Sequence, residues 1–258
     1  DRDCMTPEPY RIWHYYNQKC SLAQAFDIEI NGLDEPRELP APNITLAKGE
    51  GIQGLQLVDE AIKTTGKEKV IVIQPFGRGI MDTGGYMFDP TSRSFNLQDI
   101  STIINDLKKD YCVIVMSEFP FTTEEKESKD AYILPNIEDI RIWAGIIDRA
   151  DHFLGCDSVG QHIAKAVDST VTAVIGSTYP INISYPDDPK FDIIDLGEDK
   201  RTFSPIRLTM EDYQDMQNDE CMSMTEEDIA AVIKSCRDRL GKPVKKKIVQ
   251  AETKGFGK

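Results

Sequence analysis

The stretch from Gly155 to Ala166 (GCDSVGQHIAKA) has residue types that suit the binding of an anion. If a helix begins there, the backbone N–H groups of Ser158, Val159 and Gly160 have no partner within the helix, and the macrodipole adds about half a positive charge. A diphosphate is the ligand that this position favours, and Gly160 would allow the backbone to approach it closely. The alternative is that Asp157 or Ser158 only caps the helix. The pattern alone favours neither.

A glycine-rich loop with two arginines follows the apolar run VIVIQ, beginning QPFGRG. Gly77 and Arg78 lie at the start of this loop, and Arg93 lies further along the same connection. The two guanidinium groups could form charge-assisted, bidentate hydrogen bonds with phosphate. The alternative is a surface loop whose arginines pair with local carboxylates such as Asp82 and Asp89.

His162 stands one helical turn beyond Ser158, where it could reach a phosphate or a sugar hydroxyl. A histidine on the inner face of a helix can equally be a packing residue. The other two histidines, His14 and His152, lack the spacing of metal ligands, and the six cysteines include no C-x-x-C pair. We therefore expect no zinc site.

These candidate binding residues need a scaffold, and the sequence from Lys69 onward predicts a parallel sheet. Apolar runs typical of buried strands alternate with segments of helical periodicity. Strands are expected at 70–74, 111–116, 132–134, 153–155 and 171–175, with helices at 97–109, 137–149, 158–167 and 225–240. Asn136 is expected to cap the second helix, and Thr225 with Asp228 resembles a capping box before the last. The predicted fold is α/β, a doubly wound, Rossmann-like sheet.

Three regions follow from this pattern. Residues 1–68 have weak periodicity and a stretch rich in proline, glycine and charge at 31–43, so we expect a connector or the remnant of an N-terminal domain, with short helices around 9–25 and 55–64. Residues 69–241 form the sheet domain with its C-terminal helix, and residues 242–258 a basic tail. Because the chain begins with Asp1, we expect a fragment or a processed product.

Composition narrows the function classes. The 258 residues carry 30 Lys and Arg against 44 Asp and Glu, a formal net charge of −14 that argues against general nucleic-acid binding. No apolar run approaches the roughly 18 residues that a transmembrane helix needs. The absence of a secretory signal and the scattered cysteines favour a reducing cytoplasm.

The order of these elements resembles the C-terminal, donor-binding half of the heptosyltransferase family of bacterial lipopolysaccharide biosynthesis, which are glycosyltransferases of the GT-B fold. The family's D-[ST]-G-x-x-H element corresponds to Asp157–His162, and its G-x-T-x-P loop to Gly176–Pro180. Its Lys-x-Trp-Pro stretch corresponds to Arg93–Asn96, and Cys221–Met222 matches a Cys-Met pair before the last helix.

This resemblance implies a hexosyl or heptosyl transferase that takes a nucleotide-sugar donor and a glycan or lipid-linked sugar acceptor. The amides after Asp157 would hold the diphosphate, Arg93 would meet a phosphate, and Glu118 and Asn136 would lie near the ribose and base. No metal or other cofactor is implied. The family's catalytic base lies in its acceptor-binding domain, so we assign none here and expect a partner domain or a homo-oligomer to complete the enzyme.

The sequence departs from the family pattern in two motifs. Val159 moves the glycine one residue later, and Arg93–Asn96 has neither the Lys nor the Trp. Two further readings therefore stay open: a GT-B-derived binding or structural module without catalysis, and another nucleotide-sugar enzyme such as an epimerase.

Overall fold

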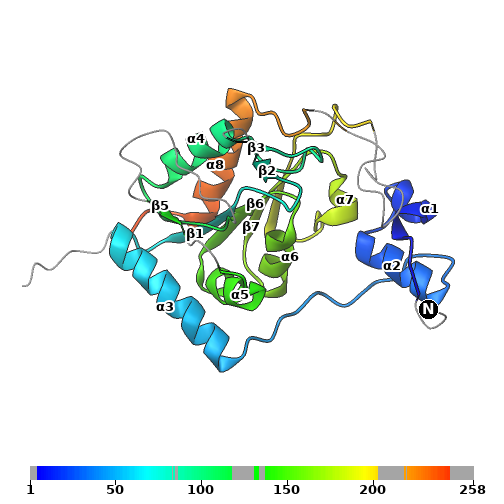
Figure 1. The fold of residues 1–258 in the computed structure, drawn as a ribbon, viewed down its shortest axis with the longest axis horizontal. Coiled ribbons are helices and arrows are strands. Elements are labelled where there is room, and N and C mark those ends of the chain that lie inside the picture. Colours follow the sequence, from blue (N-terminus) through cyan, green and yellow to red (C-terminus); the bar gives the residue numbers. More distant parts are fainter. Residues whose placement is uncertain are drawn as a thin grey trace, which may run out of the picture.

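The computed structural model describes residues 5–82, 84, 87–117, 131–133, 137–202, 218 and 220–244. Its centre is a sheet of six parallel strands: β1 (Val70–Gln74), β4 (Cys112–Val115), β5 (Ala131–Ile133), β6 (His152–Gly155), β7 (Val171–Ile175) and β8 (Phe191–Asp195). The strand order is β5-β4-β1-β6-β7-β8, so the sheet grows outward on one side of β1 and then on the other (Figure 1). This is the Rossmann order, and it confirms the predicted doubly wound sheet.

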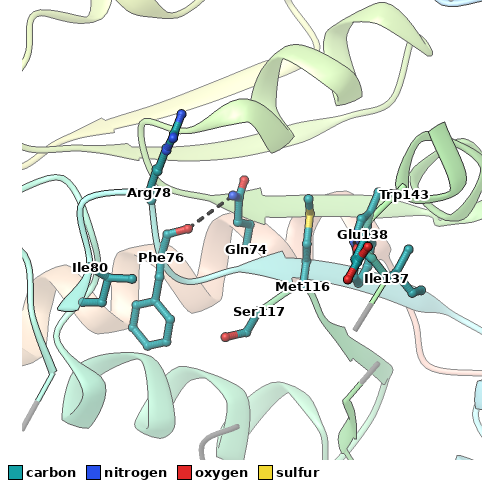
Figure 2. A pocket seen from close by; sticks show the side chains of 10 residues that line it. Gln74, Phe76, Arg78, Ile80, Met116, Ser117, Ile137, Glu138 and Trp143 are labelled. Atoms are coloured by element: carbon teal, nitrogen blue, oxygen red, sulfur yellow. Dashed lines mark hydrogen bonds between the residues drawn. The ribbon is translucent and has the colours of Figure 1, made fainter. Parts of the chain in front are cut away.

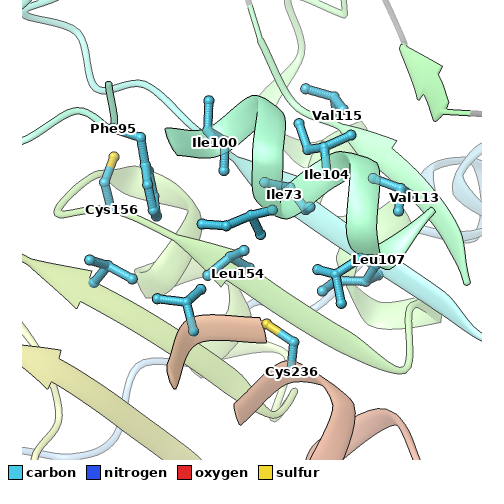
Figure 3. Packing of buried hydrophobic residues seen from close by; sticks show 14 of the residues in the cluster. Ile73, Phe95, Ile100, Ile104, Leu107, Val113, Val115, Leu154, Cys156 and Cys236 are labelled. Carbon is cyan, nitrogen blue, oxygen red and sulfur yellow. The ribbon is translucent and has the colours of Figure 1, made fainter. Parts of the chain in front are cut away.

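Helices cover both faces of the sheet. On one face lie α4 (Leu97–Leu107) and α8 (Glu226–Leu240), and on the other α3 (Lys48–Thr65), α5 (Ile140–Arg149) and α6 (Val159–Ala166) (Figure 1). Each face of the sheet forms its own hydrophobic core with the helices that cover it. Figure 3 shows the core on the face covered by α4 and α8, in which Ile104 and Leu107 of α4 lie near Val113 of β4. The central strands are buried on both faces, which is why the sequence shows them as continuous apolar runs.

Three details of the sheet domain differ from the sequence-based expectations. Strand β8 was not predicted, because it is an edge strand that is only partly buried and its sequence FDIID has no continuous apolar run. A short antiparallel pair, β2 (Met81–Asp82) and β3 (Met87–Phe88), lies within the glycine-rich connection. Helix α5 begins at Ile140, and its cap is Asp139, whose carboxylate accepts the Arg141 N–H at 2.8 Å, so the expected start after Asn136 is wrong.

The segment before the sheet contributes to the core. The helix expected at 55–64 begins earlier, at Lys48, and Val58 and Ala61 pack in the same core as α5 and the sheet. Helix α3 is therefore a layer of the sheet domain, although the sequence analysis placed it with the connector. Residues 32–47, between α2 and α3, form neither helix nor strand.

The first three helices form a small cluster of their own. They are the 3₁₀ helix η1 (Pro9–Arg11), α1 (Trp13–Tyr16) and α2 (Leu22–Asn31), so the single helix expected around 9–25 is in fact three pieces. Asn182, in α7 (Pro180–Ile183), ties this cluster to the sheet domain, because its Nδ2 donates to the backbone oxygens of Tyr15 at 3.1 Å and Cys20 at 2.8 Å.

Helix α8 begins where the sequence predicts. The predicted capping box of α8 is confirmed, since Thr225 Oγ1 accepts the Asp228 N–H at 3.2 Å and the Asp228 carboxylate accepts the Thr225 N–H at 2.8 Å. Among the described helices, none combines the length and the apolar character that crossing a membrane requires.

Candidate functional site

The two predicted binding loops meet where β1 and β6 end. Gln74, the last residue of β1, lies opposite Gly155, the last residue of β6. The loop after β1 then runs alongside the loop after β6: a Cβ added to Gly77 would lie 3.7 Å from the Asp157 backbone oxygen and 3.8 Å from Ser158 Oγ. The carboxyl ends of strands at a reversal of strand order are where open α/β sheets bind ligands. The sheet therefore brings Gly77 and the Asp157–Gly160 turn to one crevice.

Helix α6 follows β6, but the side chain that caps it belongs to Gln74 at the end of β1. Ser158 is the N-cap residue, but its side chain forms no capping hydrogen bond. Instead, Gln74 Oε1 accepts the Gly160 N–H at 2.8 Å, so the expectation that this amide would be free is wrong. The amides of Ser158 and Val159 have no hydrogen-bond partner among the residues that the structure describes. Two of the three expected donors thus remain for a ligand.

Gly160 has a tighter packing role than expected. A Cβ at this position would lie 2.4 Å from Gln74 Oε1 and 2.4 Å from Phe153 Cζ. Contacts that short do not occur between non-bonded atoms, so a side chain here would push α6 away from β1 and β6. The glycine lets the helix approach the sheet closely, and this fixes the position of the free amides.

Asp157 has no capping hydrogen bond with α6 and instead joins three segments of the crevice. Its carboxylate is buried and accepts a hydrogen bond from Thr178 Oγ1 at 2.9 Å. Arg93 Nη1 lies 3.8 Å from the same carboxylate, and Arg93 Nε donates to Thr91 Oγ1 at 3.0 Å. The ion pair therefore links the long loop after β1 to the turn before α6, and Thr178 adds the Gly176–Pro180 loop that the sequence analysis singled out.

Asp89 holds the long loop in place, a role that no local motif indicated. Its carboxylate accepts hydrogen bonds from the backbone N–H groups of Thr91 at 2.8 Å and Ser94 at 3.0 Å. Ser94 Oγ in turn accepts the Gly77 N–H at 3.0 Å. This chain of contacts anchors Gly77 beside Asp157, so the loop is ordered around the crevice over these residues.

A cavity of about 330 Å³ opens next to this turn, within the usual size range of small-molecule sites. Its lining is mostly apolar with a few polar groups, and comprises Gln74, Phe76, Gly77, Arg78, Ile80, Met116, Ser117, Ile137, Glu138 and Trp143. Figure 2 shows Arg78 at one end of this group, with Ile137, Glu138 and Trp143 at the other. Gln74 and Gly77 line the cavity and also lie next to the turn that precedes α6.

Arg78 is the cation of this cavity that is available to a ligand. Its side chain is exposed, and it has no hydrogen bond or ion pair with any part of the chain that the structure describes. The alternative in which it pairs with a local carboxylate is therefore not seen in the described residues. A guanidinium that lines a cavity and has no partner among the described residues favours an anionic ligand, even in a protein of net charge −14.

The remaining sequence candidates have different outcomes. His162 Nδ1 lies 2.9 Å from Tyr185 Oη, and the two rings pack edge to face with centroids 5.7 Å apart. Glu118 and Asn136 lie outside the described residues. Burial raises the pKa of the Cys156 thiol, which makes it a packing residue with no thiolate at neutral pH. No group of three potential metal ligands occurs within the described ranges.

Arg201 is a site neighbour that the sequence gave no reason to choose. It is buried, its Nε donates to the Gly176 backbone oxygen at 3.1 Å, and it forms an ion pair with Asp195. Its guanidinium lies over the Tyr179 ring, 4.5 Å from the centroid. Arg201 thus fixes the loop that carries Thr178, the partner of Asp157.

Comparison with solved structures finds similar folds among glycosyltransferases. A glycosyl transferase family 9 protein from Veillonella parvula DSM 2008 matches with a TM-score of 0.54 and 12% identity, over 86% of this chain and 60% of that one. The E. coli ADP-heptose LPS heptosyltransferase II gives a TM-score of 0.49 and 14% identity, over 84% and 61% of the two chains. The dodecameric iron-containing glycosyltransferase TibC from enterotoxigenic E. coli H10407 gives 0.48 and 14%, over 87% and 55%.

Sequence comparison adds no closer relative. No model of a known protein family matches this sequence, and no curated protein matches it. The chain spans 60% of the length of the Veillonella protein. The likeness to that protein is one of fold, and it confirms the fold that the resemblance predicted: this chain has an α/β architecture similar to that of the Veillonella family 9 glycosyl transferase.

Proposed function

We propose that the crevice binds the nucleoside diphosphate of a sugar donor, and that the chain is the donor-binding part of a glycosyltransferase. One observation carries this proposal: at the reversal point of the sheet, a 330 Å³ cavity lined by Arg78 adjoins the start of α6, and neither Arg78 nor the amides of Ser158 and Val159 have a partner among the described residues. Free amides and a guanidinium are donors suited to phosphate oxygens, and the apolar walls suit a nucleoside.

Each part of the crevice has a proposed role. The amides of Ser158 and Val159 bind one phosphate, and Arg78 binds the other. The nucleoside lies against the apolar end of the cavity near Trp143, where the Glu138 carboxylate can accept hydrogen bonds from ribose hydroxyls. Arg93 neutralises the buried Asp157 carboxylate, which would otherwise repel the phosphates, because the two groups are 3.8 Å apart.

The same donors would assist sugar transfer. Negative charge builds up on the leaving diphosphate as the bond to the sugar breaks, and fixed amides and a guanidinium stabilise that charge. Asp157 is already engaged by Thr178 and Arg93, so we propose that the base for the acceptor hydroxyl comes from outside this group of residues. A glycan or lipid-linked acceptor, a cytoplasmic location and a reaction without a metal stay predictions.

Replacing Arg78 with alanine is expected to weaken the binding of a nucleoside diphosphate by roughly 1.5 to 3 kcal/mol, because one charge-assisted contact to phosphate is lost. The melting temperature should hardly change, since the side chain has no partner among the described residues. Isothermal titration calorimetry with ADP, GDP and UDP, together with thermal unfolding, measures both quantities.

Arg149→Ala is the matched control, because Arg149 is an exposed arginine at the end of α5 and does not line the cavity. It removes the same charge from the surface and should leave the affinity unchanged. If Arg78→Ala binds like the wild type, the guanidinium does not contact phosphate. If the wild type binds none of the three nucleotides or their sugar conjugates at millimolar concentration, the chain is a structural module.

Transfer is tested separately from binding. A labelled nucleotide sugar that binds in the calorimeter is incubated with added glycan acceptors, and the products are separated. Turnover that falls in Arg78→Ala supports the proposed transferase. Tight binding without turnover for any acceptor is the result expected if a partner domain supplies the base.

A further inference from the structure

Gln74 occupies the floor of the proposed phosphate site. It is the last residue of β1, its side chain is buried with 6% of the residue exposed, and it lines the cavity (Figure 2). Both ends of its carboxamide are engaged by the α6 turn: Oε1 accepts the Gly160 N–H at 2.8 Å, and Nε2 donates to Ser158 Oγ at 3.0 Å. Nε2 also lies 3.2 Å from the Phe76 backbone oxygen.

The direction of the second hydrogen bond matters for the ligand. A hydroxyl has one hydrogen to donate and accepts through its lone pairs. Because Ser158 Oγ accepts from the Gln74 amide, its own hydrogen is left to point elsewhere. The amide thus leaves Ser158 with two donors for a phosphate, its backbone N–H and its hydroxyl.

The charge of the side chain matters as well. The carboxamide is neutral, so it satisfies the buried Gly160 amide without placing a negative charge beneath the phosphate site. A carboxylate of the same shape would accept the Gly160 N–H equally well and would interact favourably with the helix dipole. It would also repel phosphate and accept the Ser158 hydrogen, turning that hydroxyl away from the ligand.

We infer that Gln74 is a positioning residue that makes the α6 turn specific for an anionic ligand: it orients the Ser158 hydroxyl as a donor and keeps the floor of the site uncharged. The inference rests on the proposed function. It predicts a substitution that leaves the fold intact while selectively removing anion binding.

The test is Gln74→Glu in the full chain. Affinity for the nucleoside diphosphate that binds the wild type most tightly is expected to fall about 10- to 100-fold, because a donor is lost and a repulsive charge is gained. Affinity for the corresponding uncharged nucleoside should stay within about twofold, since the apolar end of the cavity is unchanged. The melting temperature should fall only modestly, because the helix cap is retained while the hydrogen bond from Nε2 to the Phe76 backbone oxygen is lost.

Ser158→Ala provides a second, independent measurement. It should weaken diphosphate binding about 5- to 10-fold by removing the hydroxyl donor. Combining it with Gln74→Glu should cost less than the sum of the two single changes, because both act partly through the same hydroxyl.

The outcomes separate the inference from the function on which it rests. Failure of the wild type to bind any nucleoside diphosphate contradicts the proposed function itself. If the wild type binds but Gln74→Glu lowers nucleoside and diphosphate affinity equally, Gln74 only maintains the structure and the inference is wrong. The inference is also wrong if Gln74→Glu and Ser158→Ala both bind the diphosphate like the wild type.

Discussion

Replacing Gly54 with alanine is expected to lower the free energy of unfolding by about 3 kcal/mol, the upper end of the usual range for an overpacked core. A Cβ on Gly54 of α3 would lie 2.4 Å from the carbonyl carbon of Gly145 in α5 and 2.6 Å from its oxygen. A Cβ on Gly145 would lie 2.8 Å from the Glu50 backbone oxygen. The atoms that would clash at this crossing belong to the backbone of the neighbouring helix, so the clash cannot be relieved by a side chain that moves aside. Urea unfolding followed by circular dichroism measures the change.

Gly51→Ala is the matched control within the same helix. Nothing lies within 4 Å of a Cβ at Gly51, so alanine should stabilise the chain by about 0.5 to 1 kcal/mol through its higher helix propensity. The opposite signs at two positions three residues apart would establish the close crossing. Equal effects at the two positions would mean that α3 does not pack on α5 in this register.

This crossing also bears on the site. Arg141 of α5 forms an ion pair with Glu50 of α3, in which Nη2 and Oε2 are 2.8 Å apart, and donates to the Thr45 backbone oxygen at 2.6 Å. The start of α5 carries Trp143, and the residues just before it include Glu138, which both line the cavity. A displaced α3 would therefore shift one wall of the proposed nucleoside site.

Acidification from pH 7.5 to 4.5 is expected to remove about 2.5 kcal/mol of stability through His152. This histidine is fully buried in β6, and burial lowers its pKa to about 4 from the ordinary 6.5. The unfolded chain therefore binds a proton between pH 6.5 and 4 that the folded chain excludes. The contribution is fully present above pH 6.5 and is lost as the pH falls toward 4.

Both ring nitrogens of His152 lie within hydrogen-bond distance of threonine hydroxyls. Its Nε2 lies 2.9 Å from Thr172 Oγ1, which lies 2.7 Å from Ser235 Oγ, and that hydroxyl donates to Asp192 at 3.0 Å. A hydrogen on Nε2 can start this chain of donors. Nδ1 lies 2.8 Å from Thr170 Oγ1, which itself donates to the Asp151 backbone oxygen at 3.2 Å.

His152→Asn measures the effect, because asparagine can replace part of the hydrogen bonding but does not titrate. Urea unfolding at several pH values should show a much weaker loss of stability between pH 6.5 and 4.5 in this variant. His162→Asn measures separately the contribution of His162, the other histidine whose pKa is lowered by burial. An unchanged acid dependence in His152→Asn would show that carboxylates, and not this histidine, cause the loss.

The sequence by itself determined the layered architecture and the location of the loops proposed to bind a ligand. Strand runs such as VIVIQ and VTAVI are apolar throughout because both of their faces are buried, and that property is visible in the residues alone. Helix starts such as Thr225 depend on contacts three residues apart, which are equally local. Parallel strands place their carboxyl ends at one edge, so the convergence of Gly77 with Asp157 followed from the topology.

Tertiary structure alone decided the contacts between residues far apart in the chain. Gln74 and Gly160 are 86 residues apart, and no periodicity or spacing indicates that one would cap the other's helix. The α3–α5 crossing and the hydrogen bond from Arg201 to the Gly176 backbone oxygen also join segments that are separated in the chain. Local patterns encode backbone conformation and burial, whereas partners are chosen only when the sheet brings distant segments together. The donors of the crevice that have no partner among the described residues are those that this packing does not engage.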